Sequence, residues 1–481
     1  MKSAVSTFLI LIFVLSVDGQ TSADLILINA NIRTMDERVP RAEALAVRDA
    51  RIIAVGKTSD IRKLKGDKTR VVDAGGKLVI PGFNDAHVHL TGIGNKFSHL
   101  DLKAARDSRD VVDSVAFYTS VLPKGRWVLG AGLTLTPQNS PTRAELDAVS
   151  ADNPVLIYFA GYRSALVNSA ALHRAKISRA DAVITDDLIA RVRQHVPRNH
   201  ESDWFEIVQT ASNYAARLGV TSVQDVHSDD LGDVLNGLVA RGRLKTRVYD
   251  CIGLQHRQRA IAAKLTAATG DAFVRGGCVK GLSEGEDDET AELNTSVADA
   301  DKAGLQVMIH AIGARSNANA LDAFERAIAA NGRRDRRFRI EHAARMKASD
   351  VKRLAPSDII ASMQPHLFAP GSDDYRSLVK SGAMLAFGSD ASITDFNPLL
   401  GIHAAVNSDN RSVTVDEAVR AHTFGSAYAE FQEKEKGTLA VGKLADFVVL
   451  SDDIFALEKH RIEKTSVGMT VLGGMIIFER K

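Results

Sequence analysis

Six residues of this chain carry side chains that bind divalent metal ions in proteins, and each lies in or at the end of a short apolar run. They are His87, His89, Lys280, His310, His342 and Asp390. Imidazoles and carboxylates are the usual ligands of zinc-like ions, and a lysine joins them once carbon dioxide converts its amine to an anionic carbamate. Such side chains at successive strand ends are what a metal centre at the mouth of a barrel requires. The pattern predicts a site for two divalent ions, with zinc as the expected metal.

Two of the histidines, His87 and His89, are one residue apart in a run that begins with a Pro-Gly-Phe turn. Because side chains alternate along a strand with a period of two, both imidazoles face the same side and can share one ion. His310 and His342 end later apolar runs, about one strand–helix unit apart. A single buried histidine is more often a core residue, and Asp390 alone would suit a turn. The combination of all six, in order and at strand ends, favours the metal site.

Lys280 ends a strand-like run whose burial would disfavour a charged amine. A carbamate formed there would be an anionic bridge between two cations. The alternative is a lysine that reaches solvent or pairs with Glu284 or Glu286.

Apolar runs alternate with helical stretches from residue 81 to residue 435, and this alternation predicts an α/β fold. Eight such units argue for a closed (β/α)8 TIM-like barrel. The predicted strands are residues 83–89, 221–226, 247–252, 277–282, 306–311, 337–343, 359–364 and 384–390.

Two further parts are predicted outside the regular barrel. Residues 100–205 are too long for one crossover and contain a strand of their own, so we interpret them as an insertion after the first barrel strand that caps the active-site mouth. Residues 24–80 and 436–481 contain short apolar or alternating runs separated by turn residues, which is typical of antiparallel strands. Because the ends of a domain often meet in space, we expect these two segments to form one small β-sandwich domain.

Residues 1–23 are expected to be a secretory signal peptide. Lys2 gives a basic start, an apolar stretch follows from Phe8 to Val17, and small residues come next. This stretch is too short to span a bilayer, which takes about 20 apolar residues. We therefore expect a secreted or periplasmic protein with no membrane span in the mature chain.

Composition restricts the partners. The chain has 481 residues, 25% of them charged, and a net charge of +2. We therefore expect a small-molecule substrate and no nucleic acid, and the oligomeric state, homo-oligomers included, stays open. The one dense basic run, residues 333–337, is interpreted as a solvated loop. For the two cysteines, Cys251 and Cys278, we favour buried free thiols, with a bridge between neighbouring strands as the alternative.

Eight short motifs are spread over nearly the whole chain after the predicted leader. They are Pro81-Gly-Phe-Asn-Asp-Ala-His-Val-His-Leu90, Asn168-Ser-Ala-Ala-Leu172, Gly219-Val-Thr-Ser-Val223, His310-Ala-Ile-Gly313, Arg339-Ile-Glu-His-Ala343, Ser362-Met-Gln-Pro365, Phe387-Gly-Ser-Asp390 and Gly442-Lys-Leu-Ala-Asp-Phe447. On these motifs the chain resembles the metal-dependent amidohydrolases of the amidohydrolase-3 branch and is similar to N-substituted formamide deformylases. The resemblance implies a metal-carrying barrel and a β-sandwich built from both termini.

The resemblance also implies a role for each candidate residue. His87, His89 and Asp390 would bind the more buried ion, and the other two histidines would bind the second. Carbamylated Lys280 would bridge the two ions, with a nucleophilic hydroxide between them. Asp390 would take the proton of that hydroxide and pass it to the leaving amine.

The chain departs from the family pattern at positions that shape the substrate pocket. The family's Asp-Gly-His is Ala160-Gly-Tyr162 here, its Asp-Gly after the lysine is Glu284-Gly285, and its aspartate after His-Ala-Ile-Gly is Ala314. The Gly-Trp-Asp of the family's insertion has no match. None of these positions is a metal ligand, so they bear on the substrate and not on the metal. Tyr162 and Arg163 are candidate substrate contacts, and packing is an equal alternative for Tyr162.

The sequence thus predicts a metal-dependent hydrolase that cleaves a C–N bond of a small amide, other than a peptide bond, with a metal-activated hydroxide. Two alternatives stay open. One is a deaminase-type amidohydrolase that uses a single metal ion. The other is a ligand-binding protein whose catalytic site has decayed.

Overall fold

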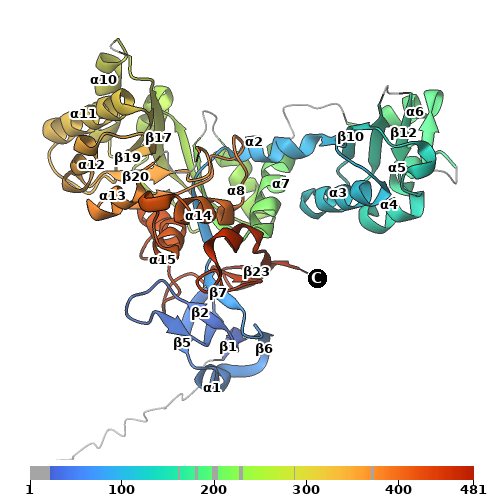
Figure 1. Ribbon diagram of the computed structural model, residues 1–481, viewed down its shortest axis with the longest axis horizontal. Helices are drawn as coiled ribbons and strands as arrows, with labels where there is room; N and C mark the ends of the chain where they lie inside the picture. Colours follow the sequence, from blue (N-terminus) through green and yellow to red (C-terminus); the bar gives the residue numbers. More distant parts are fainter. Residues whose placement is uncertain are drawn as a thin grey trace, which may run out of the picture.

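The computed structural model describes residues 22–160, 163–178, 182–197, 204–226, 231–286, 288–369 and 373–480. A barrel of parallel strands surrounded by helices carries two terminal sheets at one end and a separate inserted sheet to one side (Figure 1). Most of the predicted leader lies outside the described residues, and strand β1 (Ala23–Ile28) begins at its last residue. Over the described parts of the chain, no helix is long and apolar enough to cross a membrane.

The predicted (β/α)8 architecture is confirmed. Consecutive barrel strands are hydrogen-bonded neighbours in one parallel sheet. The strands are β8 (Phe83–Val88), β14 (Val220–Val226), β15 (Arg247–Gly253), β17 (Val274–Ser283), β18 (Gln306–Ile312), β19 (Arg339–Ala344), β20 (Ile360–Met363) and β21 (Leu385–Phe387). The helices that follow them include α7 (Trp204–Arg217), α8 (Gly232–Ala240), α10 (Thr290–Lys302), α11 (Ala314–Asn331), α12 (Ala348–Leu354) and α14 (Pro398–Val406). Their apolar faces pack on the outside of the strands in one continuous core.

The barrel closes between its first strand and the segment that follows its last strand. Val88 and Ala391 form a parallel bridge. The N–H of Asp390 donates to the carbonyl of His87 over 2.8 Å, and the N–H of His89 donates to the carbonyl of Ala391. This pairing, which we call the closing seam, places Asp390 beside both histidines of β8.

A buried carboxylate holds the two sides of the closing seam together. The Oδ1 atom of Asp85 accepts hydrogen bonds from the N–H of His87 at 3.1 Å and from the N–H of Ser389 at 2.9 Å. Gly388 lies directly against this contact, because a Cβ there would sit 2.5 Å from the His87 nitrogen and 2.7 Å from Asp85 Oδ1. The seam therefore requires glycine at this position.

The two chain ends build two sheets that share one apolar core. One has the order β5 (Arg51–Gly56), β4 (Ala44–Arg48), β1, β6 (Lys65–Asp73). The other has the order β24 (Met475–Glu479), β23 (Val467–Leu472), β22 (Phe447–Leu450), β7 (Leu78–Pro81), β2 (Asn31–Arg33), β3 (Arg41–Ala42). Strand β22 pairs antiparallel with β7, so the termini meet within one sheet. Leu27 and Val47 of the first sheet share a core with Val79 and Phe447 of the second.

The inserted segment forms a sheet of its own. Its order is β13 (Val183–Thr185), β12 (Ser164–Val167), β11 (Val155–Phe159), β10 (Val128–Leu133), β9 (Leu100–Asp101). In Figure 1 this sheet stands to the right of the barrel, with α2 (Leu90–Asn95) and α7 between them. It is attached to α7, since the amide of Asn213 donates to the carbonyl of Val121 over 2.7 Å and Tyr214 packs on Phe97 and Phe117. Its role as a cap stays a prediction.

The cysteines form a disulfide, so the preference for free thiols was wrong. Cys251 on β15 is paired in register with Cys278 on β17, and their Cα atoms are 4.8 Å apart. Two cysteines directly opposite each other on neighbouring strands are close enough to bond. The pair belongs to a buried cluster with Val226, Tyr249 and Met308.

The prediction of a solvated loop for the basic run at residues 333–337 holds in part, because residues 333–335 are exposed but Arg336 and Arg337 are buried. The guanidinium of Arg336 lies 2.7 Å from the buried carboxylate of Asp301, and Arg334 contacts the same carboxylate at 2.6 Å. Arg337 is held by Glu433 at 2.7 Å. These arginines neutralise acids that would otherwise be unpaired in the interior.

We predict that Gly388→Ala weakens both the fold and the closing seam. The added Cβ meets backbone and a buried carboxylate, which cannot move aside as a flexible side-chain end would. The expected loss is about 1–3 kcal/mol in the free energy of unfolding, measured by chemical denaturation. Gly56→Ala is the matched control, because a Cβ there meets no atom within 4 Å and should change stability by less than about 0.5 kcal/mol. Equal stability of the two variants would contradict the seam constraint.

Candidate metal centre

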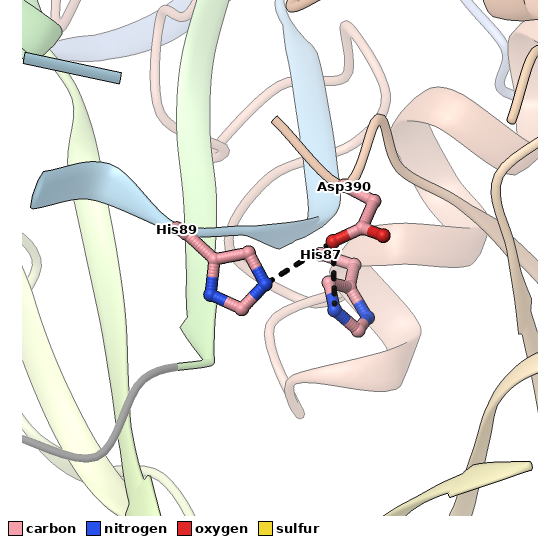
Figure 2. Close-up of side chains that lie close together, drawn as sticks. All are labelled: His87, His89 and Asp390. Atoms are coloured by element: carbon pink, nitrogen blue, oxygen red, sulfur yellow. Dashed lines mark ion pairs between the residues drawn. The ribbon is translucent and has the colours of Figure 1, made fainter. Parts of the chain in front are cut away.

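His87, His89 and Asp390 converge at the carboxyl end of the barrel (Figure 2). The Nε2 atom of His89 lies 3.1 Å from Asp390 Oδ1, and the Nε2 atom of His87 lies 3.5 Å from the same oxygen. One ligand atom from each residue lies within 4.8 Å of the others. His87 is buried and His89 is one-third exposed. Two imidazoles and a carboxylate in this arrangement match the donor set of a divalent metal ion.

The other two histidines continue the same cluster. The ring centroids of His87 and His342 are 5.0 Å apart, and those of His342 and His310 are 4.4 Å apart. With the 5.7 Å between His87 and His89, the four rings form one unbroken row from β8 through β19 to β18. The structure therefore brings together residues separated by more than half of the chain.

Local irregularities of two strands aim these side chains. Between Asp85 and Val88, strand β8 contains one more residue than the paired part of β14, and β19 contains an extra residue opposite β18. His342 sits at this second bulge with a φ of 69°. Consecutive strand residues normally face opposite sides, but here Glu341 and His342 both reach His87. Bulges that redirect side chains are common beside active sites.

Asp390 also has left-handed backbone geometry, with a φ of 59°. The segment after it is tied back by Thr394, whose hydroxyl donates to the carbonyl of Ser389. The same hydroxyl lies 3.0 Å from Nε2 of His366, which donates to the carbonyl of Asp395 over 2.8 Å. Non-glycine residues in this region cost about 1–3 kcal/mol and persist where surrounding contacts hold them. His366 and Thr394 supply such contacts, and neither was singled out from the sequence.

Glu341 orients His87 from the side opposite Asp390. The Nδ1–H of His87 donates to Oε2 of Glu341 over 2.6 Å, which leaves Nε2 free to face Asp390. Oε2 of Glu341 also accepts from Ser362 at 2.8 Å, and Oε1 accepts from Arg339 at 2.7 Å. A carboxylate behind a ligating histidine fixes the tautomer and raises the basicity of the ring. Glu341 lies in the motif Arg339-Ile-Glu-His-Ala343, but its distance from His87 in the sequence did not predict this contact.

The environment of His87, His310 and His342 favours the neutral imidazole. Burial, together with nearby Lys280, lowers the pKa of His87 to about 4. Burial and the neighbouring rings of His87 and His310 lower the pKa of His342 to about 2, and burial also lowers the pKa of His310. Metal ions bind only the neutral ring. In addition, Nδ1 of His342 is buried without a hydrogen-bond partner among the described residues. An unpaired ring nitrogen of this kind is available to bind a metal ion.

The acids of the cluster are ionised. Burial raises the pKa of Asp390, but the hydrogen bond to His89 and the rings of His87 and His342 bring it below its ordinary value. Burial also opposes ionisation of Glu341, yet Arg339 and His87 lower its pKa. Neutral rings beside ionised carboxylates make a cluster that favours a cation.

Lys280 lies close to both histidine groups. Its amine acts electrostatically on His87, His310 and His342. Burial lowers its pKa, against the opposing effect of Glu341 and Asp390. A lower pKa increases the fraction of neutral amine, which is the form that reacts with carbon dioxide. The residues present fit a divalent metal ion at His87, His89 and Asp390.

The two candidate substrate contacts lie on the inserted segment. Tyr162 is outside the described residues. Arg163 is exposed and directly precedes β12. Their role in substrate binding stays a prediction.

Comparisons with known proteins agree with this geometry. The pattern of the Amidohydrolase family matches residues 70–478. The protein LONG AFTER FAR-RED 3 of Arabidopsis thaliana is 29% identical, over 95% of this chain and 92% of that protein. The N-substituted formamide deformylase of Arthrobacter pascens is 24% identical, over 95% of this chain and 98% of that protein.

Among solved structures, an uncharacterized metal-dependent hydrolase from Pyrococcus horikoshii OT3 is similar, with a TM-score of 0.63 and 23% identity over 90% of this chain and 99% of that chain. At this identity the similarity concerns the fold, and it agrees with the barrel described above. The resemblance predicted from the motifs is confirmed by the family match. The chain belongs to the amidohydrolase family and is a metal-dependent hydrolase acting on carbon–nitrogen bonds.

Proposed function

We propose that this chain hydrolyses a C–N bond in a small, non-peptide amide and uses two divalent ions, with zinc as the expected metal. The observation that carries the proposal is the unbroken row of four imidazoles, with Asp390 at one end. Three protein ligands suffice for a catalytic ion that keeps an open position. The row is long enough to divide between two such ions.

The ligands divide according to their positions. His87, His89 and Asp390 would hold the first ion, because their ligand atoms converge. His310 and His342 would hold the second, and carbamylated Lys280 would bridge the two. Divalent ions at such a site lower the pKa of water and polarise a carbonyl group.

Asp390 is the side chain that would transfer a proton from the attacking water to the departing amine. The attacking water forms the new C–O bond and must lose a proton, and the departing amine must gain one as the C–N bond breaks. Asp390 is ionised, buried and at the carboxyl end of the barrel. It can therefore accept the first proton and deliver it to the nitrogen. Glu341 acts further back, because it touches His87 rather than the substrate.

We also propose that the protein is exported from the cytoplasm. The basic and apolar N-terminal sequence supports this proposal. A disulfide between Cys251 and Cys278 also supports it, since disulfides are rare in proteins kept in a reducing cytosol.

We predict that Glu341→Gln lowers zinc affinity about 10- to 100-fold, which is typical when the partner of a ligating histidine is removed. Glutamine keeps the shape but loses the charge that fixes the His87 tautomer. The measurement is competition with a chelator of known affinity. Glu435→Gln is the control, because that carboxylate is 41% exposed in a surface pair with Arg51. If the two variants bind zinc equally well, Glu341 does not orient His87.

The central test is Asp390→Asn combined with metal analysis. Turnover of a panel of N-formyl and N-acetyl amines should fall by about 10²- to 10⁴-fold, which is the typical contribution of a general base. The circular dichroism spectrum should stay unchanged. Asp60→Asn, on an exposed surface pair, is the control and should keep full activity.

Metal content of the wild-type protein separates the proposal from its alternatives. Two equivalents support it. One equivalent would indicate a deaminase-type site that uses a single ion, and none would indicate a ligand-binding protein. Full activity in Asp390→Asn would remove this residue from its proposed role.

A further inference from the structure

Large hydrophobic side chains are exposed at six described positions, and their distribution is uneven. They are Val39, Val71, Leu282, Ile393, Val441 and Met475. Four belong to the chain ends that build the terminal sheets. In the described part of the barrel, from residue 82 to 435, only Leu282 and Ile393 are exposed in this way. Both lie within three residues of a proposed metal ligand, Lys280 or Asp390.

Leu282 lies directly above Lys280 at the carboxyl end of β17. Residues two apart on a strand face the same side, and Cys278 of this series faces the buried cluster inside the barrel. The backbone of Leu282 is paired with that of His310. Its side chain is 53% exposed. It therefore presents an apolar surface at the mouth, next to Lys280 and His310.

Ile393 lies on the turn that follows Asp390. Its N–H donates to the carbonyl of Asp390 over 2.7 Å, so the turn is ordered. The side chain is 69% exposed, and the segment is tied down by Thr394 and His366. The exposed isoleucine is thus held in place at the rim instead of on a free loop.

Single exposed apolar residues are ordinary on protein surfaces. Here, however, the two exposed residues of the described barrel both lie within three residues of a proposed metal ligand, which is unlike a random scatter of single apolar side chains. Ligand sites combine apolar walls with a few polar groups that fix orientation. Here the imidazoles and carboxylates supply the polar groups, and Leu282 and Ile393 supply apolar surface. Exposure of that surface to water is unfavourable, so a ligand that covers it gains binding energy.

We propose that Leu282 and Ile393 form the substrate-binding rim and that the substrate carries an alkyl or aryl group next to the scissile C–N bond. This inference rests on the proposed metal-dependent function, because it places that bond at the metal ligands. Burying one methylene of the substrate against the rim should raise affinity about fourfold.

The test uses chelating probes, so it needs no knowledge of the natural substrate. Zinc-loaded protein is titrated by calorimetry with alkyl hydroxamates from acetohydroxamate to octanohydroxamate. A second series of N-alkyl-N-hydroxyformamides carries the alkyl group on nitrogen. Both series are measured with wild type, Leu282→Asn and Ile393→Asn. Val441→Asn is the matched control, since Val441 is 64% exposed and far from the mouth in sequence and domain.

We expect affinity to rise with chain length in at least one series, by about two- to fourfold per methylene. The rise should be clearly smaller in Leu282→Asn and Ile393→Asn and unchanged in Val441→Asn. Affinity independent of chain length in both series, or an equal rise in all variants, would overturn the apolar rim while acetohydroxamate binding still supports the metal centre. Failure of even acetohydroxamate to bind would refute the metal centre and, with it, the rim.

Discussion

Two backbone hydrogen bonds join the first barrel strand to the segment after the last one, and the metal centre depends on them. They place Asp390 beside His87 and His89, which lie some three hundred residues earlier in the chain. Asp85 binds N–H groups on both sides of this seam. A parallel sheet that stayed open would keep its first and last strands apart. The same hydrogen bonds that close the barrel therefore bring together the proposed ligands of the first ion.

The charges of the side chains explain why the metal centre favours cations. Burial favours the neutral rings of His87 and His342, while Asp390 and Glu341 stay ionised. Arg339, a fully buried cation nearby, is hydrogen-bonded to Glu341. Conversion of Lys280 from an amine of lowered pKa to a carbamate would replace a positive charge by a negative one. Each of these features lowers the cost of bringing divalent charge out of water.

The sequence predicted what depends on local pattern and missed what depends on register. Strand positions, and the six residues at their ends, follow from apolar runs and periodicity. The disulfide does not, because only the pairing of β15 with β17 sets Cys251 opposite Cys278. The sequence likewise did not predict that Glu341 and His342 both contact His87. This arrangement depends on the bulge at His342, and local residue propensities do not predict that bulge. The burial of Arg336 in the basic run before β19 could not be predicted either, because its partner acid, Asp301, lies on a distant helix, α10.

Chemistry and specificity occupy different parts of this barrel. Most of the proposed ligands lie on strands whose backbone is fixed by neighbours on both sides, so their geometry tolerates little change. Leu282 and Ile393 lie one step further out, where the strands give way to loops. The departures from the family pattern at Glu284 and Ala314 fall in the same outer layer. Loops at the carboxyl face of a barrel can vary without disturbing the strands beneath. A change of substrate in this family member therefore requires no change in the proposed metal ligands themselves.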